Sequence, residues 1–188
     1  MRGSFRLITV FGIDIEIHVT FFLLLMLFFL LLGPRGLMLI VGVFFFVTIH
    51  ELCHSFAALH FGIKVKRITL LPIGGVASMS EIPSKPYQEL VIALAGPFSN
   101  ILVLIIFYLP LQLMLGHEKL MYPLMAMIGR AGSAGQFSII AYIYWLNLVL
   151  AGFNLLPAFP MDGGRVLRAI LSYCMSYKKA TDIAVRMG

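Results

Sequence analysis

Charged residues are scarce in this chain. Asp, Glu, Lys and Arg make up 12% of its 188 residues, hydrophobic residues make up 61%, and the mean hydropathy is +0.99. A soluble globular domain has about 25% charged and about 45–50% apolar residues. The shortage of charge therefore excludes an ordinary soluble globular protein and predicts a polytopic membrane protein.

Cysteine is also rare. Cys53 and Cys174 lie in or near apolar segments, so no disulfide framework is expected. The basic N-terminus does not lead into a cleavable signal peptide, because Asp14 and Glu16 interrupt the apolar stretch that follows it. These features exclude a small disulfide-rich secreted protein.

Apolar runs account for most of the chain, and about four of them approach the length that crosses a bilayer. A clear turn at Gly33-Pro34-Arg35-Gly36 separates the first two runs. The first run is short for a span, so we expect the end of the preceding segment to share its membrane depth. The segment 116–136, rich in Gly and Met, is predicted to be a loop. The runs are residues 20–32, 37–61, 90–115 and 137–156.

The net charge of +6 at first suggests a nucleic-acid partner. The distribution of Lys and Arg argues against one. If the N-terminus is cytoplasmic, the basic residues gather on the inner side and leave Arg35, Lys119 and Arg130 outside. This asymmetry predicts a multi-pass protein of the cell membrane with both termini in the cytoplasm, and it explains the basic pI without nucleic acid.

Two segments alternate with the period of a β-strand. Residues 13–19 place Ile and Val on one side and Asp14, Glu16 and His18 on the other, solvated side, after a turn at Gly12. His18 is expected to be a partner of these acids, because it lacks a metal-binding companion four residues on. Residues 62–79 are predicted to form a hairpin with a turn at 72–75. The predicted fold is an all-α polytopic membrane protein with a small membrane-associated β-sheet.

The second apolar run contains the pentapeptide His50-Glu51-Leu52-Cys53-His54. Residues four apart share a helix face, so the two histidines can bind one zinc ion, and Glu51 is placed to act as the general base. A carboxylate at membrane depth costs about 2.5–3.5 kcal/mol on insertion scales, which favours a functional role. The alternative is a polar cluster that only holds helices together.

A catalytic zinc ion generally has three protein ligands and one open position. Asp162 is the best third candidate, because it follows Pro157 and Pro160 in a broken helix of the kind that membranes tolerate only beside protein or a water-filled cavity. Asp14 and Glu16 are rivals, but their strand predicts a solvated face. The sequence thus predicts one zinc ion per chain, bound between the second and fourth spans.

Three segments together resemble the site-2 protease family of intramembrane zinc metalloproteases. They are the pentapeptide at 50–54, Gly96-Pro97-Phe98-Ser99-Asn100, and residues 154–163. The second segment taken alone is typical of close helix packing. The resemblance covers most of the chain, including the strand before the first span and the hairpin after the second.

The resemblance implies zinc ligation by His50, His54 and Asp162, with Glu51 as the base. It also implies that Asn154 helps to bind the substrate or the developing oxyanion. The family cleaves transmembrane segments of other membrane proteins, often to release a regulatory factor. Such a helical substrate must unwind, and an exposed edge of the 62–79 hairpin is suited to hold it as an added strand.

The chain departs from the family at Cys53, where the family usually has Gly. A small apolar filler is expected there, and a competing thiolate ligand is the alternative. Many relatives continue with further spans or a regulatory domain beyond the point where this chain ends. We therefore expect residues 1–188 to form a single transmembrane metalloprotease core domain, truncated at its C-terminus.

Two other functions use the same residues. A metal or proton transporter would use the His, Glu and Asp side chains as a pathway and would tolerate loss of the base. The sequence has no visible internal repeat, whereas transporters often show one. A non-catalytic membrane scaffold would have a degenerate site, and none of the key residues is missing here.

Overall fold

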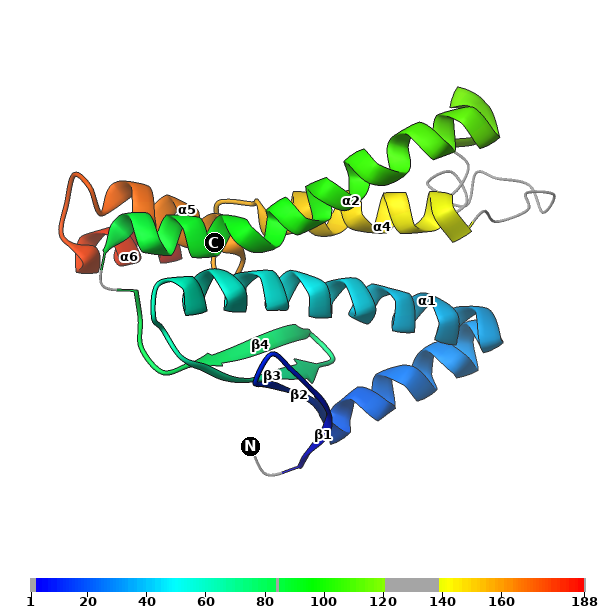
Figure 1. Cartoon of the computed structure of the whole chain (residues 1–188), viewed down its shortest axis with the longest axis horizontal. Helices are drawn as coiled ribbons and strands as arrows, with labels where there is room; N and C mark the ends of the chain where they lie inside the picture. The colour runs from blue at the N-terminus through cyan, green and yellow to red at the C-terminus, as the bar shows by residue number, and fades with distance from the viewer. Residues whose placement is uncertain (1–2, 84, 121–138, 188) are drawn as a thin grey trace.

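The computed structural model of the protein describes residues 3–83, 85–120 and 139–187. This part of the chain is mostly helical and contains one four-stranded sheet of order β1-β2-β3-β4 (Figure 1). The elements are β1 (Ser4–Val10), β2 (Ile13–His18), α1 (Val19–His60), β3 (Val65–Leu71), β4 (Gly74–Met79), α2 (Pro86–Leu120), α4 (Ile139–Asn154), α5 (Asp162–Leu171) and α6 (Tyr177–Arg186).

The sheet consists of two antiparallel hairpins, whose inner strands β2 and β3 pair in parallel. β1 pairs with β2 and β3 with β4 in antiparallel fashion, while β2 and β3 run parallel. α1 connects β2 to β3 and so forms the crossover that a parallel pair needs. β1 and β4 are the two edges of the sheet. The hairpin predicted at 62–79 is confirmed, although Gly74 and Gly75 of its predicted turn already belong to β4.

The alternation of β2 divides the sheet into an apolar and a polar face. Ile13 and Ile15 are buried. On the other face Glu16 pairs with Arg67 at 3.2 Å and Asp14 pairs with Arg6 at 3.6 Å. The predicted strand and its polar face are confirmed. The expected pairing of His18 with these acids is wrong, because its Nδ1 accepts a hydrogen bond from the backbone N–H of Thr20 and caps α1.

α1 is bent back on itself at Gly33, which has φ 64° and ψ −153°. A left-handed φ of this kind favours glycine, and Pro34 then starts the second limb with a φ already suited to a helix. The first limb, residues 19–32, and the second limb, residues 34–60, fold against each other (Figure 1). Phe21 and Phe44 pack edge to face between them, with ring centroids 4.5 Å apart. The predicted turn is thus confined to one non-helical residue.

The second limb of α1 lies in the middle of the molecule. The sheet covers one side of it, and α2 and α4 lie on the opposite side (Figure 1). The core joins these layers through buried side chains from each of them. Its central members are Ile13 of β2, Phe44 and Ala58 of α1, Ile68 of β3 and Ile92 of α2. This arrangement places the pentapeptide 50–54 between the sheet and α2.

Two helices of the described chain are long and apolar enough to cross a membrane, at Val19–His60 and Pro86–Pro110. The apolar helix Ile143–Asn154 is shorter. Many large apolar side chains of α1 and α2 are exposed, including Leu30, Leu31 and Ile105, as expected for lipid-facing surfaces. These features indicate a membrane protein, but the prediction of about four spans is not confirmed.

The predicted loop at 116–136 is wrong at its beginning, because α2 continues as a helix to Leu120. Nothing in residues 116–120 stops the helix that precedes them, since a single Gly costs only about 1 kcal/mol in a helix interior. The remainder of the predicted loop, together with residues 137–138 of the expected fourth span, lies outside the described residues.

Candidate metal centre

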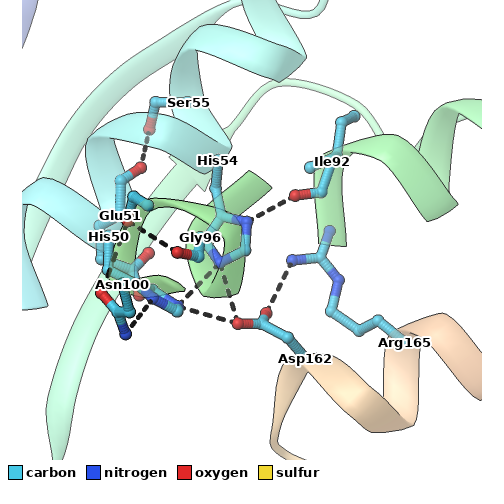
Figure 2. A network of polar contacts seen from close by, with 10 residues as sticks. His50, Glu51, His54, Ser55, Ile92, Gly96, Asn100, Asp162 and Arg165 are labelled. Atoms are coloured by element: carbon cyan, nitrogen blue, oxygen red, sulfur yellow. Dashed lines mark hydrogen bonds and ion pairs between the residues drawn. The ribbon is translucent and has the colours of Figure 1, made fainter. Parts of the chain in front are cut away.

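Three side chains from distant parts of the chain meet in a buried cluster. Oδ2 of Asp162 lies 2.9 Å from Nε2 of His50 and 2.9 Å from Nε2 of His54, and the two Nε2 atoms are 3.1 Å apart (Figure 2). All three residues are at most 8% exposed. Two imidazoles and a carboxylate whose ligand atoms lie this close together can bind one metal ion.

The His54 ring is held in the orientation that a metal ligand requires. Its Nδ1 lies 2.6 Å from the backbone carbonyl oxygen of Ile92 in α2. A carbonyl only accepts hydrogen bonds, so Nδ1 carries the proton and Nε2 keeps its lone pair. The Ile92 carbonyl therefore selects the tautomer in which Nε2 faces the cluster.

α2 also supports His50. Nδ2 of the Asn100 amide lies 3.3 Å from Nδ1 of His50, and Asn100 is 1% exposed. For Nδ1 to donate while Nε2 binds a metal, the amide has to turn so that its Oδ1 accepts. Ring nitrogens that are not bound to a metal almost always have such a partner in metal-binding histidines. The sequence pointed to Asn100 as part of a packing motif, but its contact with His50 follows only from the placement of α2 against α1.

Gly96 leaves the space that an ion needs. A Cβ atom at this position would lie 2.3 Å from Nε2 of His54 and 2.5 Å from Nε2 of His50, so it would stand among the ligand atoms. Only glycine lets α2 approach the two histidines while leaving the volume between them free. The donor set and this free volume together fit a zinc ion.

Asp162 reaches the cluster from the first turn of α5. Its Oδ2 faces the histidines, and its Oδ1 lies 3.8 Å from Nη1 of Arg165, one turn further along the same helix. The two carboxylate oxygens thus have different partners, one in the cluster and one outside it (Figure 2). Outer contacts of this kind orient a ligating carboxylate.

A cavity of about 570 Å³ opens beside the cluster. His54, Asp162 and Glu51 line it at one end, and residues of β4 form one of its walls. Glu51 is not one of the three clustered ligands, so its carboxylate remains available to a molecule inside the cavity. A metal cluster, a free carboxylate and an adjoining cavity are the parts that metal-assisted hydrolysis requires.

Comparison with known proteins also points to a metal-dependent hydrolase. Residues 38–188 match the model of peptidase family M50, which is well over half of the chain. The chain belongs to peptidase family M50. The matched range includes the pentapeptide 50–54, Gly96 and Asp162. All residues of the metal cluster thus lie in the part of the chain that matches the family.

The chain is similar to curated proteins, one of which is named a zinc metalloprotease. The M50 chain is 40% identical to the zinc metalloprotease MJ0392 of Methanocaldococcus jannaschii, over 100% of this chain and 51% of that protein. It is 28% identical to the stage IV sporulation protein FB of Bacillus subtilis, over 71% of this chain and 40% of that one. The chain therefore spans about half of the length of the curated relative MJ0392.

A solved structure supports the fold. The site-2 protease from Methanocaldococcus jannaschii has 39% sequence identity and a TM-score of 0.72, and the match covers 98% of this chain and 79% of that chain. The resemblance to the site-2 protease family that the sequence motifs indicated is therefore confirmed. Zinc, the expected cofactor, agrees with the family and with the cluster of two histidines and one aspartate.

The other residues singled out in the sequence are placed as follows. Asp14 and Glu16 lie on the sheet, paired with Arg6 and Arg67, and take no part in the cluster. Cys53 is half-buried and is not among the clustered ligands of the described chain. Asn154 is the last residue of α4 and does not line the cavity, so its suggested role stays a prediction.

Gly75 of β4 packs directly against Glu51, although its sequence context indicated only a turn. A Cβ atom at Gly75 would lie 2.5 Å from Cγ of Glu51. We expect Gly75→Ala to displace Glu51 and to lower the rate of peptide cleavage roughly 10²-fold, as a misplacement of about 1 Å does. Zinc content should not change, because Gly75 does not touch the metal cluster.

The measurement is cleavage of a single-span substrate together with elemental analysis of the purified variant. Ile73→Ala is the matched control, since the Ile73 side chain, in the turn before β4, is 93% exposed and does not line the cavity. Near-normal cleavage by Gly75→Ala would show that the position of Glu51 does not depend on this contact.

Proposed function

We propose that the chain is the core of an intramembrane zinc-dependent endopeptidase, which hydrolyses peptide bonds within or near transmembrane segments of other membrane proteins. The observation that carries the proposal is the meeting of His50, His54 and Asp162 beside a cavity that Glu51 also lines. The two histidines and Glu51 belong to a helix apolar enough to cross a membrane. Residues 1–188 act as one transmembrane metalloprotease domain.

His50, His54 and Asp162 are the proposed ligands. A zinc ion held by these side chains would supply a Lewis acid for the scissile carbonyl group and would lower the pKa of a water molecule. Glu51 takes a proton from that water as its oxygen forms a bond to the carbonyl carbon. The C–N bond then breaks, and Glu51 returns the proton to the leaving nitrogen. Asn154 is proposed to bind the substrate backbone or the developing oxyanion.

The proposed substrate lies extended along β4. β4 is an edge strand of the sheet, and Gly75, Val76, Ala77 and Met79 of this strand line the cavity. An edge strand has backbone N–H and C=O groups that can pair with an added peptide. A substrate helix has its carbonyl groups hydrogen-bonded internally, so pairing with β4 would stabilise the unwound form that hydrolysis needs.

Metal content and cleavage test this proposal together. Purified protein should contain about one zinc ion per chain, and chelation should abolish cleavage of a single-span substrate. His54→Ala and Asp162→Ala should each lose most of the zinc. Asp14→Ala, on the polar face of the sheet, is the matched control and should retain it. Full retention of zinc in both ligand variants would contradict the ligand assignment.

The proposed topology has about four spans, formed by the two limbs of α1, by α2 and by α4, with both termini in the cytoplasm. The concentration of Lys and Arg on one side of this arrangement supports it. Reporter fusions at the two ends of the chain should both give a cytoplasmic signal. Signals from opposite sides of the membrane would show an odd number of spans, and the short first limb of α1 would then be the segment to re-examine.

A further inference from the structure

A buried ion pair lies outside the metal cluster and is not used by the proposed chemistry. Glu89, in the first turn of α2, is 1% exposed. Arg168 of α5 donates from Nε to Oε1 of Glu89 at 2.9 Å, and its Nη2 contacts the same oxygen. A buried carboxylate is costly unless it is paired and hydrogen-bonded, so this contact strongly fixes α5 against α2.

Arg168 is also held between two aromatic rings. Its guanidinium carbon lies 5.0 Å from the ring centroid of Phe159 and 4.9 Å from that of Tyr177 in α6. Burial, followed by the charge of Glu89, raises the pKa of the Tyr177 phenol against the opposing effect of Arg168 and Arg165. Both rings present an uncharged aromatic face to the guanidinium.

These contacts fix the chain on both sides of Asp162. Phe159 precedes Asp162 in the non-helical segment after α4, and Arg168 follows it in α5. Because Phe159 and Arg168 touch each other, and Arg168 is bound to Glu89, the residues on either side of the aspartate share one anchor on α2.

The anchor lies on the same face of α2 as the groups that support the metal cluster. Ile92 and Gly96 follow Glu89 by three and seven residues, and residues at these spacings lie on one side of a helix. Ile92 orients His54, and Gly96 provides the free volume between the histidines. The position of Asp162 relative to His54 is therefore set through a single helix.

We propose that Arg168 is a positioning residue for the metal centre, and that its contacts with Glu89 and Phe159 hold Asp162 at the distance from His50 and His54 that tight metal binding requires. The inference rests on the proposed function in one respect, namely that Asp162 is a metal ligand. Loss of the clamp formed by Glu89, Arg168 and Phe159 leaves all three ligands in the chain but releases one of them from its position.

The test is metal affinity in the whole protein, purified in detergent. The main variant is the double substitution Glu89→Gln with Arg168→Met, which leaves no unpaired charge buried at this site. Zinc affinity is measured by competition with a chromogenic chelator, and the absorption spectrum of Co²⁺ in place of zinc reports the coordination of the ion. We expect a 10–100-fold loss of zinc affinity, the range that follows when the groups supporting a metal ligand are removed, and a changed Co²⁺ spectrum.

Three further variants make the result decisive. Arg186→Met, near the end of α6, removes an exposed arginine and should match the wild type. Arg168→Lys keeps the charge but not the paired donors or the planar stack, and should give an intermediate loss in a fully folded protein. Asp162→Asn tests the ligand itself and should lose metal more severely than the clamp variants.

The possible outcomes separate the two proposals. If Asp162→Asn loses zinc while the double variant and Arg168→Lys keep wild-type affinity and an unchanged Co²⁺ spectrum, the clamp is overturned and the ligand assignment stands. A lower melting temperature with unaltered metal affinity likewise overturns it, because the pair then serves only the fold. If Asp162→Asn binds zinc normally, the ligand assignment fails and the clamp with it.

Discussion

Replacing Glu51 with Gln should leave the zinc content unchanged and lower the rate of cleavage of a membrane-embedded substrate by about 10²–10⁴-fold, the usual contribution of a general base. Glu51 lines the cavity but is not one of the clustered ligands, so the metal should not depend on its charge. Gln has nearly the same size and still forms hydrogen bonds, but it cannot accept the proton of the attacking water.

The experiment compares purified wild type with Glu51→Gln, using zinc analysis and the rate of cleavage of a single-span substrate in detergent or proteoliposomes. Glu81→Gln is the matched control, because Glu81 is an exposed carboxylate that lines the same cavity. It should cleave at a near-normal rate. A Glu51→Gln variant that binds zinc and cuts as fast as the wild type would remove the general base from the proposed mechanism.

Gly96→Ala should also have a large effect, through the metal instead of the base. The added methyl group would lie 2.3 Å from Nε2 of His54 and 2.5 Å from Nε2 of His50, well inside van der Waals contact. The imidazoles or the whole of α2 must move to relieve this overlap, and either movement separates the ligands from one another. We expect zinc affinity to fall at least about 10–100-fold and cleavage to fall with it.

Gly152→Ala in α4 is the control for this experiment, because a Cβ atom there has no other atom within 4 Å. That variant should keep zinc and activity, and it should gain slight helix stability. Zinc affinity and circular dichroism are measured for both variants. A folded Gly96→Ala protein with wild-type zinc affinity would show that the free volume at Gly96 is not where the ion binds.

The sequence predicted those parts of the site that are marked by residue spacing within one helix or by prolines and glycines that break a helix. His50 and His54 share a face because they are four residues apart on one helix. Asp162 is 112 residues from His50, yet it could be singled out because prolines and glycines around an acid are unusual in an apolar segment. Their meeting in the structure agrees with that prediction.

What the sequence could not predict depends on the placement of one helix against another. The carbonyl of Ile92 belongs to a residue whose side chain is ordinary core, so no pattern marks it as a partner of His54. β1 was missed because its pairing is irregular between Arg6 and Ile8 and its apolar side chains do not alternate. The pair between Glu89 and Arg168 was missed because 79 residues separate its members.

The face of α2 that carries Glu89, Ile92 and Asn100 has a consequence for how a substrate would enter. Asn100 touches His50, Ile92 touches His54, and Glu89 holds the segment that carries Asp162. Sliding α2 by one helical turn, about 5.4 Å, would break all of these contacts at once and dismantle the metal centre. We therefore expect α2 to keep its place, and a gate for an entering peptide to be built from the elements that line the cavity, such as β4 and residues 80–83.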